Sequence, residues 1–182
     1  MIRNFDDRPL PPACVERLLA NARRGPSAGF TQGFELLVLE GPTETSRYWD
    51  ASLASDDRAG FRWPGLLRAP LLIVPFADER AYRDRYVEPD KTAARASFRT
   101  PWWLVDTSFA AMLVLLTAVD AGLGALFFGV FEPDAVRAAF GVPDRFEPLG
   151  AIAIGYPAPD EPSRSVVRGR RPAADVIHRG GW

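Results

Sequence analysis

Few side chains in this sequence could carry out chemistry on their own. The 182 residues include one cysteine, Cys14, and one histidine, His178. A structural zinc site normally takes four Cys or His ligands and a disulfide takes two cysteines, so we expect neither a metal site nor a disulfide. A Ser-His-Asp triad would have to use His178, and no serine follows a strand in a nucleophile elbow. The sequence therefore disfavours metal-dependent and histidine-dependent chemistry.

Two stretches instead combine residue types that suit ligand binding. The sequence "GPSAGFTQGF" at residues 25–34 holds three glycines, a proline, a serine, a threonine and a glutamine, which makes it too polar for a core. It is either a connector between a helix and a strand or a cradle for a phosphorylated or planar group. The sequence "RGRR" at residues 168–171 is either a solvated tail or a phosphate grip, because an arginine fork can donate two hydrogen bonds to phosphate oxygens.

The composition is that of a globular protein, with 47% hydrophobic and 12% aromatic residues. We expect one domain over residues 1–182, or one protomer of a dimer. The net charge of −1 gives no basic field, which argues against nucleic acid as a partner. No hydrophobic signal follows Met1, and the apolar run at 109–119 is about half the ~20 residues that cross a bilayer, so we expect a cytoplasmic protein with no membrane partner.

Helical and strand patterns are mixed along the chain. We expect helices at 10–25, 43–54 and 132–143, and a long apolar helix that begins at a cap on Asp106 or Thr107 and leaves through a left-handed turn at Gly122 or Gly124. We expect strands at 34–41, 69–76, 125–131 and 149–157, a short strand at 175–178, and a short helix plus mobile loop between 78 and 100. No regular βαβ alternation is present, which predicts an α+β fold. The sequence "GLGALFFG" enters a strand rather than a helix, so it is not a dinucleotide fingerprint.

Taken in order, five segments resemble the nitroreductase family of FMN-dependent flavoproteins. They are "IRNFDDRPLP", "PSAGFTQGFELLVLE", "VDTSFAAMLVLLTAVDAGLGALFFGVF", "LGAIAIGYP" and "RGRRPAADVIH", and they cover most of the chain except about residues 43–100. The resemblance implies a three-layer α+β fold, with a central, mainly antiparallel sheet flanked by helices, in an intertwined homodimer. It also implies one FMN per subunit at the dimer interface. Because the cofactor carries the redox chemistry, no catalytic side chain is required.

The resemblance also assigns binding residues. Arg3 matches a cation near the ribityl chain and pyrimidine edge, where it would stabilise the negative charge of the reduced ring; the alternative is an exposed terminal arginine. Arg168 and Arg170 match a pair that holds the FMN phosphate. The flavin loop of the family matches Pro26, Ser27, Ala28, Gly29 and Gln32, and the backbone segment facing flavin N5 and O4 matches Phe128 and Gly129.

The chain departs from the family pattern at three positions. Phe30 stands where the family usually carries asparagine, and Gly33 stands where proline is common. Met1 stands where the serine of an Arg-Arg-Ser triplet would be. These departures put one polar flavin contact and part of the phosphate grip in doubt.

Other residues are open to two interpretations. Either Arg62 or Arg68 could supply a second cation near the pyrimidine ring. Four aromatic residues could stack on an acceptor or simply pack in the core or dimer interface: Tyr86, Phe98, Trp102 and Trp103. For Phe127 and Phe131 we expect burial in a strand with a glycine bulge.

The sequence therefore predicts an FMN-dependent oxidoreductase that passes hydride from NADH or NADPH to a small aromatic, nitroaromatic or quinone-like acceptor. A protein of the same fold that binds flavin or the deazaflavin F420 for storage, sensing or partner recognition is the alternative. An interaction scaffold built on the dimer is a third possibility. Fold membership alone does not choose among them.

Overall fold

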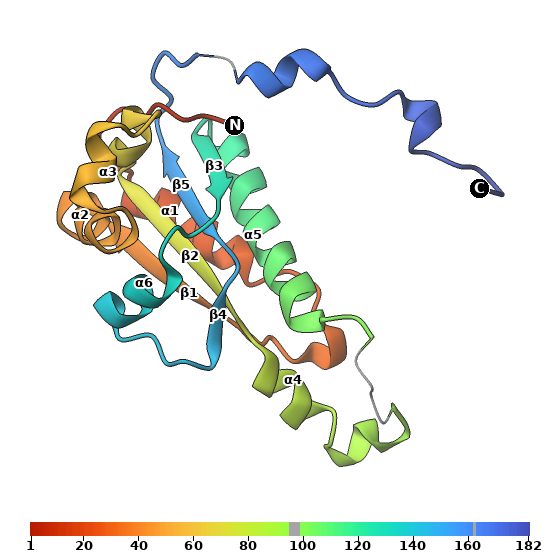
Figure 1. The fold of residues 1–182 in the computed structure, drawn as a ribbon. Coiled ribbons are helices and arrows are strands. Elements are labelled where there is room, and N and C mark those ends of the chain that lie inside the picture. The colour runs from red at the N-terminus through yellow and green to blue at the C-terminus, as the bar shows by residue number, and fades with distance from the viewer. Residues whose placement is uncertain (95–98, 162) are drawn as a thin grey trace.

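The computed structural model describes residues 1–94, 99–161 and 163–182 and has a mixed α+β fold (Figure 1). A five-stranded antiparallel sheet has the order β1-β2-β5-β3, with β4 paired to β2. The strands are Phe34–Glu40 (β1), Leu71–Asp78 (β2), Gly124–Phe128 (β3), Phe146–Pro148 (β4) and Ala151–Gly155 (β5). The helices are Pro12–Ala22 (α1), Gly41–Ser52 (α2), Ser55–Ala59 (α3), Glu79–Arg85 (α4), Trp102–Asp120 (α5) and Pro133–Phe140 (α6). This architecture confirms the expected fold class.

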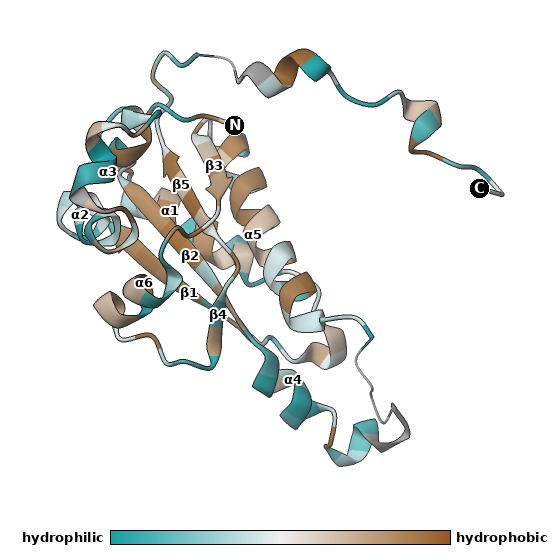
Figure 2. Ribbon diagram, viewed as in Figure 1, coloured by the Kyte–Doolittle hydropathy of each residue, from teal (hydrophilic) through white to brown (hydrophobic). Residues whose placement is uncertain are grey.

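Strand β2 forms the centre of the sheet, and all eight of its residues are buried. Its side chains alternate between the two faces, as the pleat of a strand requires. Leu71 and Ile73 pack in a hydrophobic cluster with α1 and α5, whereas Leu72, Val74 and Phe76 pack in a second cluster with α2 and α6. The sheet is thus covered on both faces, and hydrophobic residues concentrate along it in Figure 2. A strand buried on both sides explains the continuous apolar run that marks it in the sequence.

Helix α5 differs from its expected boundaries. It begins at Trp102, directly after Pro101, so the expectation of a cap at Asp106 or Thr107 was wrong. Both residues are buried inside the helix, where the Thr107 hydroxyl donates to the Trp103 carbonyl at 2.6 Å. The far end agrees with expectation, because Gly122 adopts a left-handed φ of 72°.

Two further differences concern short elements. Strand β4 was not expected, because three residues give too little alternation to read from sequence. The strand expected at 175–178 was wrong: a 3-10 turn, Ala173–Asp175, precedes an unpaired segment there. That segment belongs to the C-terminal arm, residues 163–182, which runs away from the sheet (Figure 1). The arm exposes Val167 and Ile177, at 89% and 56%.

The burial of Tyr48 makes the stability of the fold depend on pH in the alkaline range. Its side chain is fully buried on α2, and this burial raises the pKa from 10.0 to about 12. The neutral phenol therefore stabilises the fold below pH 10, and this contribution is lost as the pH rises toward 12. We expect the free energy of unfolding to fall by about 2 kcal/mol between pH 10 and pH 12. We expect the Tyr48→Phe variant to lack this pH-dependent loss. Urea titrations at pH 7 and pH 12 measure it, and an unchanged alkaline loss in Tyr48→Phe would contradict it.

Candidate active site

The glycine-rich loop, residues 25–34, has an unusual backbone. Gly29, Phe30 and Gln32 have φ angles of 64°, 53° and 54°, all in the left-handed region. Residues other than glycine rarely adopt this conformation, and it persists where the surroundings hold it. The Phe30 side chain is 78% exposed, so its own packing does not supply the restraint.

Hydrogen bonds within the loop supply part of that restraint. The Gln32 N–H donates to the Ser27 hydroxyl oxygen at 2.7 Å, and the Thr31 hydroxyl donates to the Ala28 carbonyl at 2.6 Å. The Ala28 N–H donates to Oδ2 of Asp106 on α5 at 2.7 Å. These bonds close the loop on itself and fix it to a buried helix.

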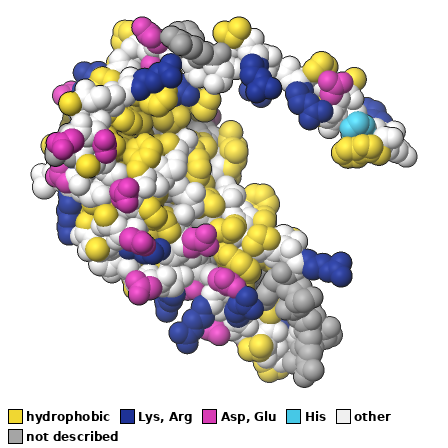
Figure 3. Space-filling view, viewed as in Figure 1, with side chains coloured by type: hydrophobic (Ala, Val, Ile, Leu, Met, Phe, Trp, Pro, Cys, Tyr) yellow, Lys and Arg dark blue, Asp and Glu magenta, His cyan; other side chains and the backbone are white. Residues whose placement is uncertain are grey.

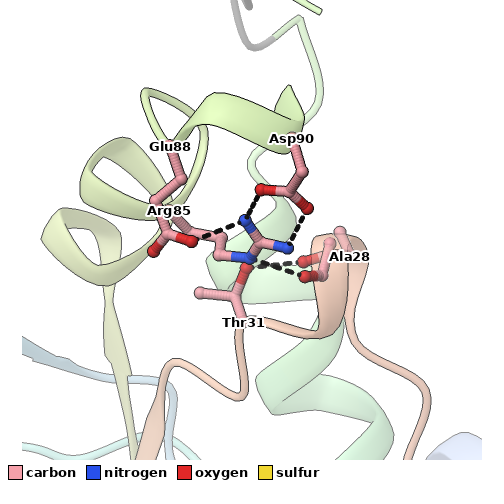
Figure 4. Close-up of polar contacts among 6 residues, drawn as sticks. Ala28, Thr31, Arg85, Glu88 and Asp90 are labelled. Atoms are coloured by element: carbon pink, nitrogen blue, oxygen red, sulfur yellow. Dashed lines mark hydrogen bonds and ion pairs between the residues drawn. The ribbon is translucent and has the colours of Figure 1, made fainter. Parts of the chain in front are cut away.

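Arg85, at the end of α4, supports the loop from the other side (Figure 4). Its Nε donates to the Gly29 carbonyl at 3.0 Å. Two bonds of 2.7 Å to Asp90 and one of 2.8 Å to Glu88 orient the guanidinium. The bonds from Arg85 lower the pKa of Asp90 to about 2, so the ion pair persists at neutral pH. The loop is therefore held in shape by contacts on two sides.

The end of strand β3 leaves an open position. Phe128 stacks on Trp49 with ring centroids 5.6 Å apart, so its side chain belongs to the core. A Cβ on Gly129 would meet no heavy atom within 4 Å, which leaves its backbone open to a planar group. The expectation that Phe127 and Phe131 are buried was wrong: they are 38% and 46% exposed, because Phe127 lies on the edge strand β3 and Phe131 lies beyond its end.

A cavity of about 460 Å³ lies beside the N-terminal segment. Arg3 and Arg62 line it, and their guanidinium groups lie 5.3 and 5.1 Å from the ring centroid of Trp63. The Arg3 N–H donates to Oδ2 of Asp160 at 2.7 Å, and Arg68 donates to the Asn4 side chain at 2.7 Å. Of the two candidates for a second cation, Arg62 thus lines the cavity, and Arg68 contacts it through Asn4.

The proposed binding residues do not lie together within one chain. The glycine-rich loop precedes Phe34, which pairs with Ala77 at one end of the sheet. Arg3 lies at the other end, where its neighbour Ile2 bonds to β3 (Figure 1). Arg168 and Arg170 are exposed on the C-terminal arm and do not line the cavity at Arg3.

The aromatic residues that could stack on an acceptor also lie in different places. The Tyr86 ring packs on the glycine-rich loop, since a Cβ on Gly29 would lie 3.0 Å from it. Trp102 is 37% exposed and Trp103 is half-buried in the first turn of α5. Phe98 lies outside the described residues. The structure therefore places Tyr86 against the loop.

Helix α5 carries an exposed apolar stripe, consisting of Phe109, Met112, Leu116 and Val119, which are 41 to 67% exposed. Their spacing of three and four residues puts them on one face of the helix, and Figure 3 shows hydrophobic side chains gathered there. The helix is long and apolar enough to cross a membrane by length and composition alone. It packs along α1 and the sheet, as core helices of soluble proteins also do. An exposed stripe of this kind marks an interaction surface.

Sequence reasoning missed the residues that hold the loop. Asp106, Tyr82 and Arg85 were not assigned to the site, although Asp106 is the only charged residue between Trp102 and Val119. A single carboxylate in an apolar helix indicates that a buried hydrogen-bond donor pairs with it. Among the described residues, no group of three His, Cys, Asp or Glu side chains could hold a metal ion.

Comparison with known proteins gives consistent matches. The model of the nitroreductase family matches residues 1–156. An NADH dehydrogenase from Thermus thermophilus is 27% identical over 176 residues, covering 86% of this chain and 82% of the relative. A nitroreductase family protein from Clostridium difficile 630 has a TM-score of 0.74 at 23% identity, covering 100% of this chain and 93% of that one. NfrA1 of B. megaterium has a TM-score of 0.76 at 19% identity, covering 100% of this chain and 70% of that one.

Proposed function

Because this chain belongs to the nitroreductase family, we propose that it is an FMN-dependent oxidoreductase. It takes hydride from NADH or NADPH and passes electrons to a small aromatic, nitroaromatic or quinone-like acceptor. The observation that carries the proposal is the glycine-rich loop, which is left-handed at Phe30 and Gln32 and is held by contacts from α4 and α5 at Ala28 and Gly29. The name of the Thermus thermophilus relative, NADH dehydrogenase, supports a nicotinamide as electron donor. A cytoplasmic location stays a prediction.

The residues present fit FMN in charge and shape. Arg3 and Arg62 offer cations beside an open cavity, and Gly129 offers an open backbone. Bound flavin would supply the ring that accepts and releases hydride. The protein would hold the phosphate with arginines, including Arg168 and Arg170, and stabilise negative charge on the ring with Arg3.

Within one chain, the glycine-rich loop and Arg3 lie at opposite ends of the sheet. Strand β2 has eight residues and so spans ~26 Å, between the end near the glycine-rich loop and the end near Arg3. A flavin that uses both must therefore lie between two copies. We expect an intertwined homodimer in which the apolar stripe of α5 is buried and the C-terminal arm crosses to the partner.

The visible absorption spectrum of the purified protein tests the proposed function. A yellow protein that NADPH bleaches, and that menadione or nitrofurazone then reoxidises, supports the oxidoreductase. A yellow protein that neither NADH nor NADPH can bleach supports the alternative, a flavin-binding or F420-related protein with little turnover. A colourless protein that does not take up FMN contradicts both of these functions and favours the third possibility, an interaction scaffold built on the dimer.

The arm arginines provide a prediction about FMN affinity. Arg170→Ala removes one charge-assisted contact to the phosphate, so we expect FMN binding to weaken by about 1.5–3 kcal/mol, or roughly 10- to 100-fold. Fluorescence titration of the apoprotein with FMN measures this loss. Arg171→Ala is the matched control, because the Arg171 guanidinium already donates to the Asp175 carbonyl at 2.7 Å. Equal FMN affinity in the Arg170→Ala variant and the parent protein would refute the assignment.

A further inference from the structure

Two buried polar side chains meet beneath the glycine-rich loop. Tyr82 on α4 is fully buried, and Asp106 on α5 is 3% exposed. The Tyr82 hydroxyl donates to Oδ2 of Asp106 at 2.7 Å, and the same oxygen accepts from the Ala28 N–H at 2.7 Å. Burying a carboxylate is costly unless it is hydrogen-bonded, so these two donors account for its position.

The Tyr82 ring also lies against the end of the loop. The Gly33 backbone lies directly on the ring, since a Cβ there would be 2.5 Å from Cε2 of Tyr82. The Tyr82 side chain thus contacts the end of the loop, and its hydroxyl holds the carboxylate that accepts from the start of the loop at Ala28.

The direction of these hydrogen bonds follows from the atoms. A phenol has one proton, and Tyr82 gives it to Asp106. Burial and the bond to Asp106 both raise the pKa of Tyr82, so the proton stays in place at neutral pH. The Ser27 hydroxyl oxygen accepts from the Gln32 N–H, which closes the loop between its two anchored ends.

We propose that Asp106 and Tyr82 are positioning residues that hold the glycine-rich loop in the shape in which it receives bound flavin. The inference rests on the proposed function and deepens it. Asp106 anchors the start of the loop at the Ala28 N–H, and Tyr82 both holds the Asp106 carboxylate and packs against Gly33 at the end of the loop.

Binding of FMN to the apoprotein tests this role through variants of two residues. We expect Tyr82→Phe to weaken FMN binding about tenfold, because the buried hydrogen bond to Asp106 is lost. A double variant of Tyr82→Phe and Asp106→Ala should bind no more than about twofold more weakly than Asp106→Ala alone, since the Tyr82 hydroxyl acts through Asp106. A double variant in which the two losses multiply would overturn this coupling.

Variants of Asp106 separate positioning from general stability. Asp106→Asn keeps an oxygen that accepts both bonds, so we expect FMN affinity within about threefold of the parent, whereas Asp106→Ala should lose roughly 30-fold. Asp84→Asn, an exposed carboxylate on the helix of Tyr82, is the matched control and should leave affinity unchanged. Equal losses in the Asn and Ala variants would contradict the role of an acceptor at this position.

Amide hydrogen exchange in the apoprotein tests the loop independently of flavin. We expect faster exchange at Ala28 in both Asp106→Ala and Tyr82→Phe, because each variant disturbs the carboxylate that holds this N–H, with unchanged exchange in β2. Unchanged loop exchange in both variants would overturn the positioning role. A parent protein that does not bind FMN but shows the expected exchange would instead overturn the proposed function and leave the loop restraint standing.

Discussion

Leu116→Glu is expected to convert the proposed dimer into a monomer and to abolish flavin retention. Leu116 is 58% exposed in one chain, so its replacement leaves the fold of the monomer intact. In a two-fold symmetric dimer the change would bury two unpaired carboxylates, each costing several kcal/mol. We therefore expect self-association to weaken by at least about 1000-fold, and FMN to dissociate because the flavin site needs both copies. Analytical ultracentrifugation and the visible spectrum measure the two effects.

A charge on the opposite face of the sheet controls for the change in net charge. Ser46 is exposed on α2, which packs on the face of the sheet away from α5. Ser46→Glu should leave both the sedimentation coefficient and the flavin content unchanged. A Leu116→Glu protein that stays dimeric would show that the apolar stripe of α5 is not the interface.

Gly129→Val is expected to empty the flavin site without unfolding the protein. A Cβ at this position meets no protein atom within 4 Å, and its φ is not in the left-handed region, so the chain itself tolerates valine. The added carbons would occupy the space through which the backbone approaches a planar ring. We expect FMN affinity to fall by more than about 30-fold, as for a steric clash costing over 2 kcal/mol. Fluorescence titration with FMN and thermal melting of the apoprotein measure the two properties.

Gly60 offers a matched comparison for this substitution. Its φ is −97°, and a Cβ there would meet only the Asp57 carbonyl, at 4.0 Å. Gly60→Val should therefore change neither melting temperature nor flavin affinity. Normal FMN affinity in Gly129→Val would remove the end of β3 from the proposed site.

Much of the fold could be predicted from the sequence because burial leaves a pattern. Strand β2 is apolar at successive positions since both faces are covered, and α5 is apolar around most of its circumference since it packs on α1 and the sheet. The start of α5 was misplaced because Asp106 has the residue type of a cap. Its carboxylate instead accepts from Ala28 and Tyr82, which are 78 and 24 residues away, and no local pattern reports such partners.

The candidate site was predictable only in part. The residue types of the glycine-rich loop indicated a cradle, and the structure adds that Phe30 and Gln32 are held in left-handed conformations. The support from Tyr82 and Arg85 could not be predicted, because it depends on how α4 follows β2. The position of Arg168 and Arg170 relative to the flavin stays a prediction, since the arm lines the Arg3 cavity at Ser163 and Ser165 and the two arginines do not.

The separation of the glycine-rich loop from the Arg3 cavity has a genetic consequence in the proposed dimer. Each flavin would be bound by the loop of one copy and the arginines of the other, so neither copy would contain a complete site. A mixed dimer, with one copy defective at Ser27 and the other at Arg3, would contain one intact site and one doubly damaged site. Two alleles that are each inactive alone would then complement each other when expressed together.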